Sequence, residues 1–308
     1  MKISTSFLFD RATDRMGKLQ NQLATTQAQM AEAKQVLSPS DAPDQAAAIQ
    51  RLRGEIERQD SHVRTLNVAT ARFQAEEAAL TNTSDLLIRL KELTIQAAND
   101  TLGPDDRKSV AVEMRSIRNQ LLDLSNSQDD NGNYLFSGTR VKSPAFVEQS
   151  DGSVLYMGDQ TQTRIPAGVE RSVQFTRSGT DVFSRVMRTD SAGVTTSVGF
   201  FQAIDEMVNA VENSDTKTIQ QGLGDVSQMH NNVTLALAQT GSDQSVVQSQ
   251  QDMLGETTLR LKSTLSDIED LDYTTAVTRM NKEMMSLQAA MGSFSKISGL
   301  SLFDYIRN

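Results

Sequence analysis

The chain has 308 residues and a formal net charge of −9, with 39 acidic residues against 30 basic ones. An acidic chain without a basic cluster repels the phosphate backbone, so we expect no nucleic-acid partner. Cysteine is absent, which excludes disulfides, thiolate metal sites and thiol catalysis.

The N-terminal segment predicts a long helix with a coiled-coil seam. Its apolar and small residues recur at alternating steps of three and four, which is the heptad spacing. The seam consists of Phe9, Ala12, Met16, Leu19, Leu23, Thr26, Met30, Ala33 and Leu37. We expect the helix to run to Leu37 and to end before Pro39, because proline breaks a helix.

Neither a membrane span nor a cleaved signal is predicted. No apolar run approaches the roughly 18–20 residues that cross a bilayer, so we expect no membrane insertion. The apolar patch Phe7–Phe9 ends at Asp10, whereas a secretory signal needs an apolar stretch of about 7–15 residues.

Two further helices are predicted before residue 125. Pro43 sits where a first-turn proline is tolerated, and the chain from there to Asn99 has no other proline. Gly103 and Pro104 form a turn, after which apolar residues again recur at helical spacing up to Leu124. A short loop between two long amphipathic helices predicts an antiparallel helical hairpin.

The composition changes in the middle of the chain to Gly, Thr, Ser, Val and Phe. The stretches 153–156, 163–165 and 172–175 read as short strands, and Asp151-Gly152 is typical of a hairpin turn. We expect a small β-rich region here.

Helical spacing returns at Phe200, and Gly241-Ser242-Asp243 is expected to cap a further helix that runs to about Asp270. Two seams follow, and they are one position out of phase, which predicts a hinge or boundary between them. The first consists of Leu254, Thr258, Leu261, Leu265 and Ile268, and the second of Tyr273, Val277, Met280, Met284, Leu287, Met291 and Phe294.

The predicted fold is mainly α, with a long helical coiled-coil rod formed by the N- and C-terminal segments and a small β-rich domain inserted in the middle. Residues 1–42 and 258–308 are expected to form a terminal coiled-coil region. Residues 43–138 and 198–257 form the helical rod, and 139–197 form a projecting β-rich domain.

The sequence offers no catalytic or metal-binding set. His62 and His230 lie in helical segments without a second ligand at a defined spacing. The stretch around Asp129 resembles part of a calcium loop, but its first and twelfth positions would be Ser127 and Gly138, which do not fit. We therefore expect a chain that is not an enzyme and uses no cofactor or metal.

The terminal seams are the candidate functional residues. These seams contain few large aliphatic side chains, so a single pair of helices would bury little apolar surface. We therefore interpret them as an assembly interface between copies of the chain. The alternative is an ordinary helix pair within one chain. The interface residues are Phe9, Met16, Leu19, Leu23, Met30, Leu261, Leu265, Ile268, Val277, Met280, Met284, Leu287, Met291, Phe294, Leu300 and Phe303.

Several stretches in order resemble one family. They are Met1–Ser6 (MKISTS), Ser38–Pro43 (SPSDAP), Asn131–Thr139 (NGNYLFSGT), Ser263–Tyr273 (STLSDIEDLDY) and Lys296–Tyr305 (KISGLSLFDY). The sequence resembles the hook-associated protein 3 family, the hook–filament junction proteins of the flagellin superfamily. The resemblance covers residues 1 to about 147 and about 245 to 308.

The resemblance implies a structural subunit of the bacterial flagellum that is exported without a cleaved signal and resides outside the cell. It implies that the terminal segments, residues 1–42 and 258–308, are disordered in the free monomer and form coiled coils in an inner tube once copies assemble into a ring-like or helical layer. The implied partners are copies of the chain itself, the other hook–filament junction protein, flagellin and a cytoplasmic export chaperone. A minor flagellin is the nearest alternative, and a surface adhesin that uses the β-rich region is a more distant one.

Overall fold

The computed structural model describes residues 2–99, 101–166, 172–189 and 194–306, and within these ranges the side chains of Phe7 and of residues 9–296. The chain divides into two compact units: Met1–Ser61 with Gly255–Asn308, and His62–Leu254. The helices α2 (Pro43–Ala97) and α6 (Thr216–Glu269) contribute residues to both units. The strands belong to the second unit together with its helices, and the three-part division expected from the sequence stays a prediction.

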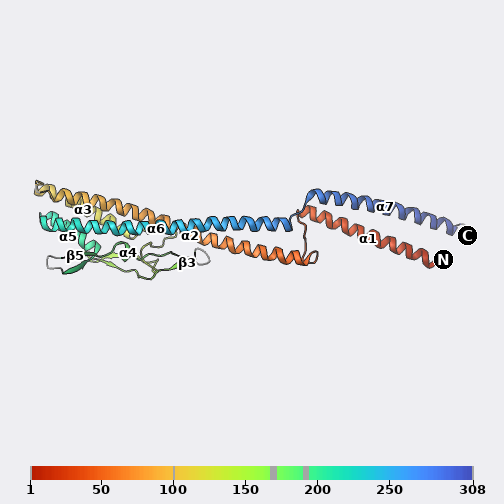
Figure 1. Ribbon diagram of the computed structural model, residues 1–308, viewed down its shortest axis with the longest axis horizontal. Helices are drawn as coiled ribbons and strands as arrows, with labels where there is room; N and C mark the ends of the chain where they lie inside the picture. The colour runs from red at the N-terminus through yellow and green to blue at the C-terminus, as the bar shows by residue number, and fades with distance from the viewer. Residues whose placement is uncertain (1, 100, 167–171, 190–193, 307–308) are drawn as a thin grey trace. The chain divides into compact units, whose positions relative to one another are not determined.

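In the first unit, α1 (Lys2–Glu32) and α7 (Tyr273–Ile306) lie side by side, as Figure 1 shows. The prediction that α1 would reach Leu37 was wrong. Ala33 adopts a φ of 57°, a left-handed conformation that ends a helix instead of continuing it. The helix therefore ends at Glu32, seven residues before the proline at position 39.

The segments that follow α1 and α6 are joined by backbone hydrogen bonds. The Gln35 amide donates to the Glu269 carbonyl at 2.8 Å, and the Leu271 amide donates to the Ala33 carbonyl at 3.0 Å. Between them Lys34 and Asp270 form an antiparallel bridge. A helix break lies between the two C-terminal seams, because α6 ends at Glu269 and α7 begins at Tyr273. Both sides of the break belong to the first unit, so the expected hinge or domain boundary at this point stays a prediction.

The helical core of the second unit is built by α2, α3 (Pro104–Ser125), α5 (Phe200–Glu212) and α6. Leucines at helical spacing on α2 pack with apolar side chains of the other three helices. The fully buried members include Leu80, Leu87, Leu90, Met114, Leu121, Ile204 and Met207. No described helix is both long enough and apolar enough to cross a membrane.

The expected helix cap at Gly241-Ser242-Asp243 was wrong, because α6 continues through these residues. Asp243 is buried instead of capping, and Val247, one turn later, is packed in a second core cluster with Leu66 and Phe73. A glycine inside a helix costs about 1 kcal/mol relative to alanine, which this burial outweighs.

The β-rich region consists, in its described part, of three two-stranded antiparallel sheets. Their pairs are β1 (Phe146–Glu148) with β2 (Val154–Tyr156), β3 (Arg164–Pro166) with β4 (Ser172–Gln174), and β5 (Val186–Thr189) with β6 (Thr195–Val198). A short helix, α4 (Gly179–Val182), lies between the second and third sheets. The predicted fold class, mainly α with a small β-rich region in the middle, is confirmed.

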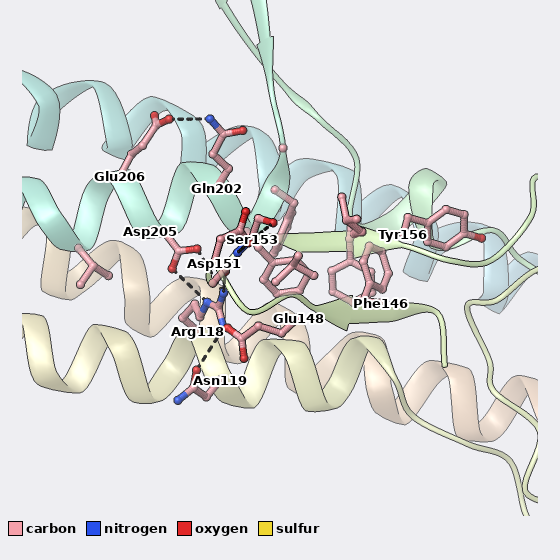
Figure 2. A pocket seen from close by; sticks show the side chains of 18 of the residues that line it. Arg118, Asn119, Phe146, Glu148, Asp151, Ser153, Tyr156, Gln202, Asp205 and Glu206 are labelled. Atoms are coloured by element: carbon pink, nitrogen blue, oxygen red, sulfur yellow. Dashed lines mark hydrogen bonds and ion pairs between the residues drawn. The ribbon is translucent and has the colours of Figure 1, made fainter. Parts of the chain in front are cut away.

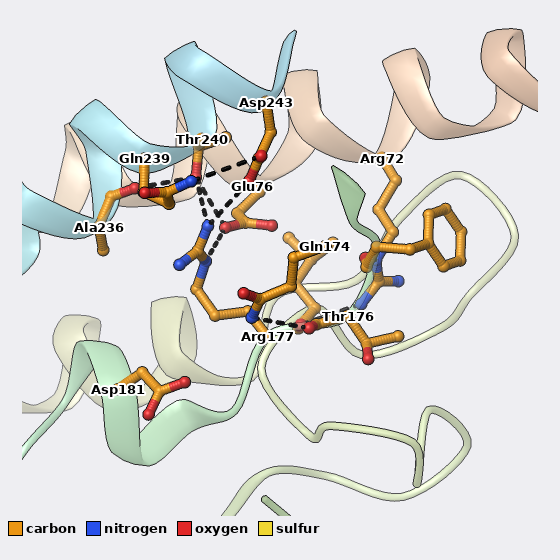
Figure 3. A network of polar contacts seen from close by, with 12 residues as sticks. Arg72, Glu76, Gln174, Thr176, Arg177, Asp181, Ala236, Gln239, Thr240 and Asp243 are labelled. Atoms are coloured by element: carbon orange, nitrogen blue, oxygen red, sulfur yellow. Dashed lines mark hydrogen bonds and ion pairs between the residues drawn. The ribbon is translucent and has the colours of Figure 1, made fainter. Parts of the chain in front are cut away.

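Two buried arginines attach the β-rich region to the long helices, as Figure 3 shows. Arg177, which follows β4, pairs with Glu76 of α2 and donates to Thr240 Oγ1 of α6 at 3.2 Å. Arg72 of α2 donates to the carbonyls of Leu135 and Phe175, each at 2.9 Å. Because both guanidinium groups are buried and surrounded by hydrogen-bond acceptors, the segment that follows β4 is held at a defined place on α2 and α6.

Candidate assembly interface

The helices α1 and α7 pack antiparallel and in register. At one end Tyr273 Oη donates to the Met30 carbonyl at 3.0 Å. At the other end the rings of Phe9 and Phe294 meet edge to face, with centroids 5.1 Å apart. The two contacts are separated by the same number of residues on each helix, so the register holds along the pair.

The α1 half of the predicted seam faces α7 but is only partly covered. Phe9, Met16, Leu19, Leu23 and Met30 are each partly buried. On this seam the fully buried described residue is Thr26, whose side chain is small. The pair therefore leaves apolar surface on its own seam accessible.

The α7 half of the predicted seam divides into two stripes. Met280, Leu287 and Phe294 are partly buried toward α1, together with the buried Ala276. Val277, Met284 and Met291 stay 39%, 40% and 49% exposed, and we call these three residues the outer stripe. Among the predicted α7 residues whose side chains the structure describes, only half therefore pack against α1.

The remaining predicted interface residues lie elsewhere. Leu261, Leu265 and Ile268 are partly buried on α6, before the break that separates it from α7. The side chains of Leu300 and Phe303 lie outside the described residues. Leu259 on α6 is 68% exposed and was not among the predicted interface residues. It lies outside the heptad positions, so the spacing of apolar residues did not indicate it.

A buried carboxylate holds the junction of these helices together. Glu269 is 6% exposed, and its Oε1 lies 2.9 Å from Lys34 Nζ and 2.5 Å from Arg53 Nη2. Burial alone would raise the pKa of Glu269, but the hydrogen bonds from the two cations outweigh burial and hold the pKa below its usual value. Sequence reasoning missed this cluster, although the acidic run at the seam break was its visible signal.

The second unit contains a cavity of about 1010 Å³ between α3, α5 and the β1–β2 hairpin. Figure 2 shows Arg118 pointing toward two carboxylates, and its guanidinium donates to Asp205 at 3.0 Å and to Glu148 at 2.6 Å. Arg118 also donates to the Gly152 carbonyl at 3.1 Å. Burial raises the pKa of Asp205, and the bond from Arg118 opposes this shift. The charged groups of this cluster pair with one another, and their bonds attach the β1–β2 hairpin to α3 and α5.

The histidines do not form a reactive set with the residues that the structure describes. His62 is exposed on α2, and His230 Nε2 lies 3.2 Å from Ser84 Oγ. Among the described residues no group of His, Cys, Asp and Glu side chains could hold a metal ion. The best candidate for a functional site is therefore the α1–α7 helix pair, whose apolar seam is only partly covered.

Comparisons with known proteins match both ends of the chain to one family. The bacterial flagellin N-terminal helical region matches residues 3–141, and the bacterial flagellin C-terminal helical region matches residues 223–306. Flagellar hook-associated protein 3 of Escherichia coli is 24% identical over 317 residues, with 99% of each chain covered. The protein of the same name in Salmonella typhimurium is 24% identical over 320 residues, with both chains fully covered. Flagellin of Listeria monocytogenes is 21% identical over 296 residues, covering 96% of this chain and 95% of that one.

Solved structures share the fold. The crystal structure of Xanthomonas campestris FlgL is 23% identical, with a TM-score of 0.63 over 71% of this chain and 99% of that one. A putative flagellar hook-associated protein from Vibrio parahaemolyticus is 19% identical, with a TM-score of 0.64 over 75% of this chain and all of that one.

Proposed function

The chain belongs to the bacterial flagellin family, and from this we propose that it is a structural subunit of the flagellum that forms the junction layer between hook and filament. The observation that carries the proposal is the end-to-end match to two proteins named flagellar hook-associated protein 3. A match that spans both terminal regions and the middle of the chain indicates the same order of parts, not a shared helix alone.

The proposed mechanism is mechanical and uses the terminal helices. The partly covered seam of α1 and the outer stripe of α7 would be buried by helices of neighbouring copies. Burial of apolar surface contributes roughly 25 cal/mol per Å², whereas ordering a residue costs about 1–2 kcal/mol, so a helix pair with a thin seam gains most of its stability from neighbours. Leu261, Leu265, Ile268, Leu300 and Phe303 complete the proposed interface.

The proposed partners follow from this role. They are further copies of the chain in a ring-like or helical layer, the other hook–filament junction protein on one side and flagellin on the other. We further propose a cytoplasmic export chaperone that holds the C-terminal region before export without a cleaved signal. The proposed location is the extracellular flagellum.

A minor flagellin is the second candidate, supported by the 21% identity to Listeria monocytogenes flagellin over 96% of this chain. The two roles differ in the assembly that forms. A junction subunit stops after a thin layer, whereas a flagellin continues to polymerise into a filament.

The test is to add purified protein to isolated hooks that carry the other junction protein, and to view the product by electron microscopy. A short cap that then accepts flagellin supports the junction role. Long filaments made of this chain alone would establish the flagellin alternative. Failure to bind either hooks or filaments would overturn both.

A further inference from the structure

A carboxylate lies in the middle of the α7 face that packs on α1. Glu283 follows Met280 by three residues and precedes Leu287 by four, so all three side chains share one face of the helix. The register set by the Met30–Tyr273 and Phe9–Phe294 contacts places Glu283 at the level of Gln20, between Leu19 and Leu23 on α1.

One oxygen of this carboxylate is not satisfied by the described residues around it. Its Oε2 atom is buried and has no hydrogen-bond partner among the described residues. The α1 seam residues at this level, Leu19 and Leu23, carry no donor side chain. A carboxylate oxygen removed from water without a donor destabilises the structure that buries it, so the α1–α7 pair is incomplete at this point.

The rest of the Glu283 side chain is partly exposed, so a donor can approach from outside the pair. The next residue, Met284, belongs to the exposed outer stripe. A helix that covered the outer stripe would therefore pass close to Glu283. Exposed cations on α1 and α7 are available on every copy to meet it: Arg15, Lys18, Arg279 and Lys282.

We propose that Glu283 pairs with a basic side chain from α1 or α7 of a second copy of the chain, and that this ion pair sets the axial register between neighbours. The inference rests on the proposed assembly of the terminal helices. A polar group at a single core position of a coiled coil selects one register at some cost in stability, because any other register leaves it unpaired. The apolar residues of the outer stripe supply burial but little register information, since a heptad shift brings them back into contact.

The first test separates the free chain from the assembly. Glu283→Leu removes the unpaired charge, so hydrogen exchange of the α7 amides in the free chain should slow by about threefold or more. The same variant should bind isolated hooks at least about tenfold more weakly, because the neighbour's cation is then left without its partner. Glu256→Leu is the matched control, since Glu256 is an exposed carboxylate on α6, and it should change neither measurement.

The second test identifies the partner by charge reversal. Glu283→Lys should abolish ordered assembly, and one additional Lys→Glu or Arg→Glu change on α1 or α7 should restore it. The positions to combine are Lys2, Arg11, Arg15, Lys18, Arg279, Lys282 and Lys296. Restoration by one position and not by the others would establish the pair.

Three results would overturn the inference, and they are distinguishable from failure of the proposed function. Wild-type protein that assembles while Glu283→Leu assembles equally well would remove the role of Glu283 and leave the junction role standing. Absence of rescue by all seven reversals would do the same. Wild-type protein that does not bind hooks at all would overturn both proposals.

Discussion

Replacing Arg177 by methionine tests whether buried ion pairs hold the β-rich region on the helices. The Arg177 side chain is 7% exposed and its partner Glu76 is 2% exposed. The Arg177→Met variant fills a similar volume but leaves Glu76 buried without its cation, and it also removes the bond to Thr240. Breaking a buried pair by removing one partner costs about 3–5 kcal/mol, so we expect the free energy of unfolding to fall by about that much.

The assay is urea unfolding followed by circular dichroism, with the slope compared between variants to confirm that the same surface unfolds. Arg164→Met is the matched control, because Arg164 is an exposed arginine on β3, and it should cost less than about 1 kcal/mol. The double variant Arg177→Met with Glu76→Leu should recover part of the loss, since Glu76 is then no longer an unpaired charge, whereas Asp243, whose Oδ2 lies 4.0 Å from Arg177 Nη2, still lacks its cation. A loss below about 1 kcal/mol for Arg177→Met alone would refute the reasoning.

Three further changes follow from the same contacts. Glu269→Gln should lower the stability of the first unit by about 1–3 kcal/mol at neutral pH, measured by hydrogen exchange of α1 and α7. Because the pKa of Glu269 is held below its ordinary value of 4.5, its contribution is complete above that pH and is lost as the pH falls through the lowered pKa, so the variant should show a weaker acid dependence. Serine at all three outer-stripe positions should leave unfolding of the free chain within about 0.5 kcal/mol of wild type and abolish assembly on hooks. Gly222→Ala should destabilise by about 1–3 kcal/mol, because a Cβ there would meet Met207 Sδ at 2.7 Å, whereas Gly224→Ala meets nothing within 4 Å and should stabilise by about 0.5–1 kcal/mol.

Each of these expectations has a contradicting result. Equal acid sensitivity of wild type and Glu269→Gln would show that the carboxylate does not hold the junction. Unimpaired assembly of the outer-stripe variant would remove that stripe from the interface. The same sign of change for Gly222→Ala and Gly224→Ala would mean that contact with Met207 does not decide the packing of α6.

Elements that depend on neighbours in the sequence were predictable. The helices that begin at Pro43 and Pro104 start where the first-turn prolines indicated, and the hairpin turn at Gly152 adopts a φ of 83°, which glycine accommodates. These features follow from local sterics and from the spacing of apolar residues, which no distant contact has to supply.

Features that depend on distant partners were missed or misplaced. Asp243 reads as a cap next to Gly241, but in the structure it is buried inside α6 beside Arg177, with Arg177 Nη2 at 4.0 Å from its Oδ2. Lys34, Arg53 and Glu269 are far apart in the sequence and meet in one cluster. An ion pair between distant residues produces no repeating pattern in a single sequence, so it can be identified only from the tertiary structure.

The sequence by itself determined that the chain ends in two helices with heptad seams and that these flank a β-rich middle. It did not determine which residues of the α7 seam face α1 and which face outward. Residues that recur at steps of three and four lie on one broad apolar face, and the spacing does not say which edge of that face packs against the partner helix. That choice was made by packing against α1, which covers Met280 and Leu287, leaves Met284 exposed, and buries one oxygen of Glu283. The physical reason is that periodicity defines an apolar face, whereas the rotation of that face is decided by the partner that buries it.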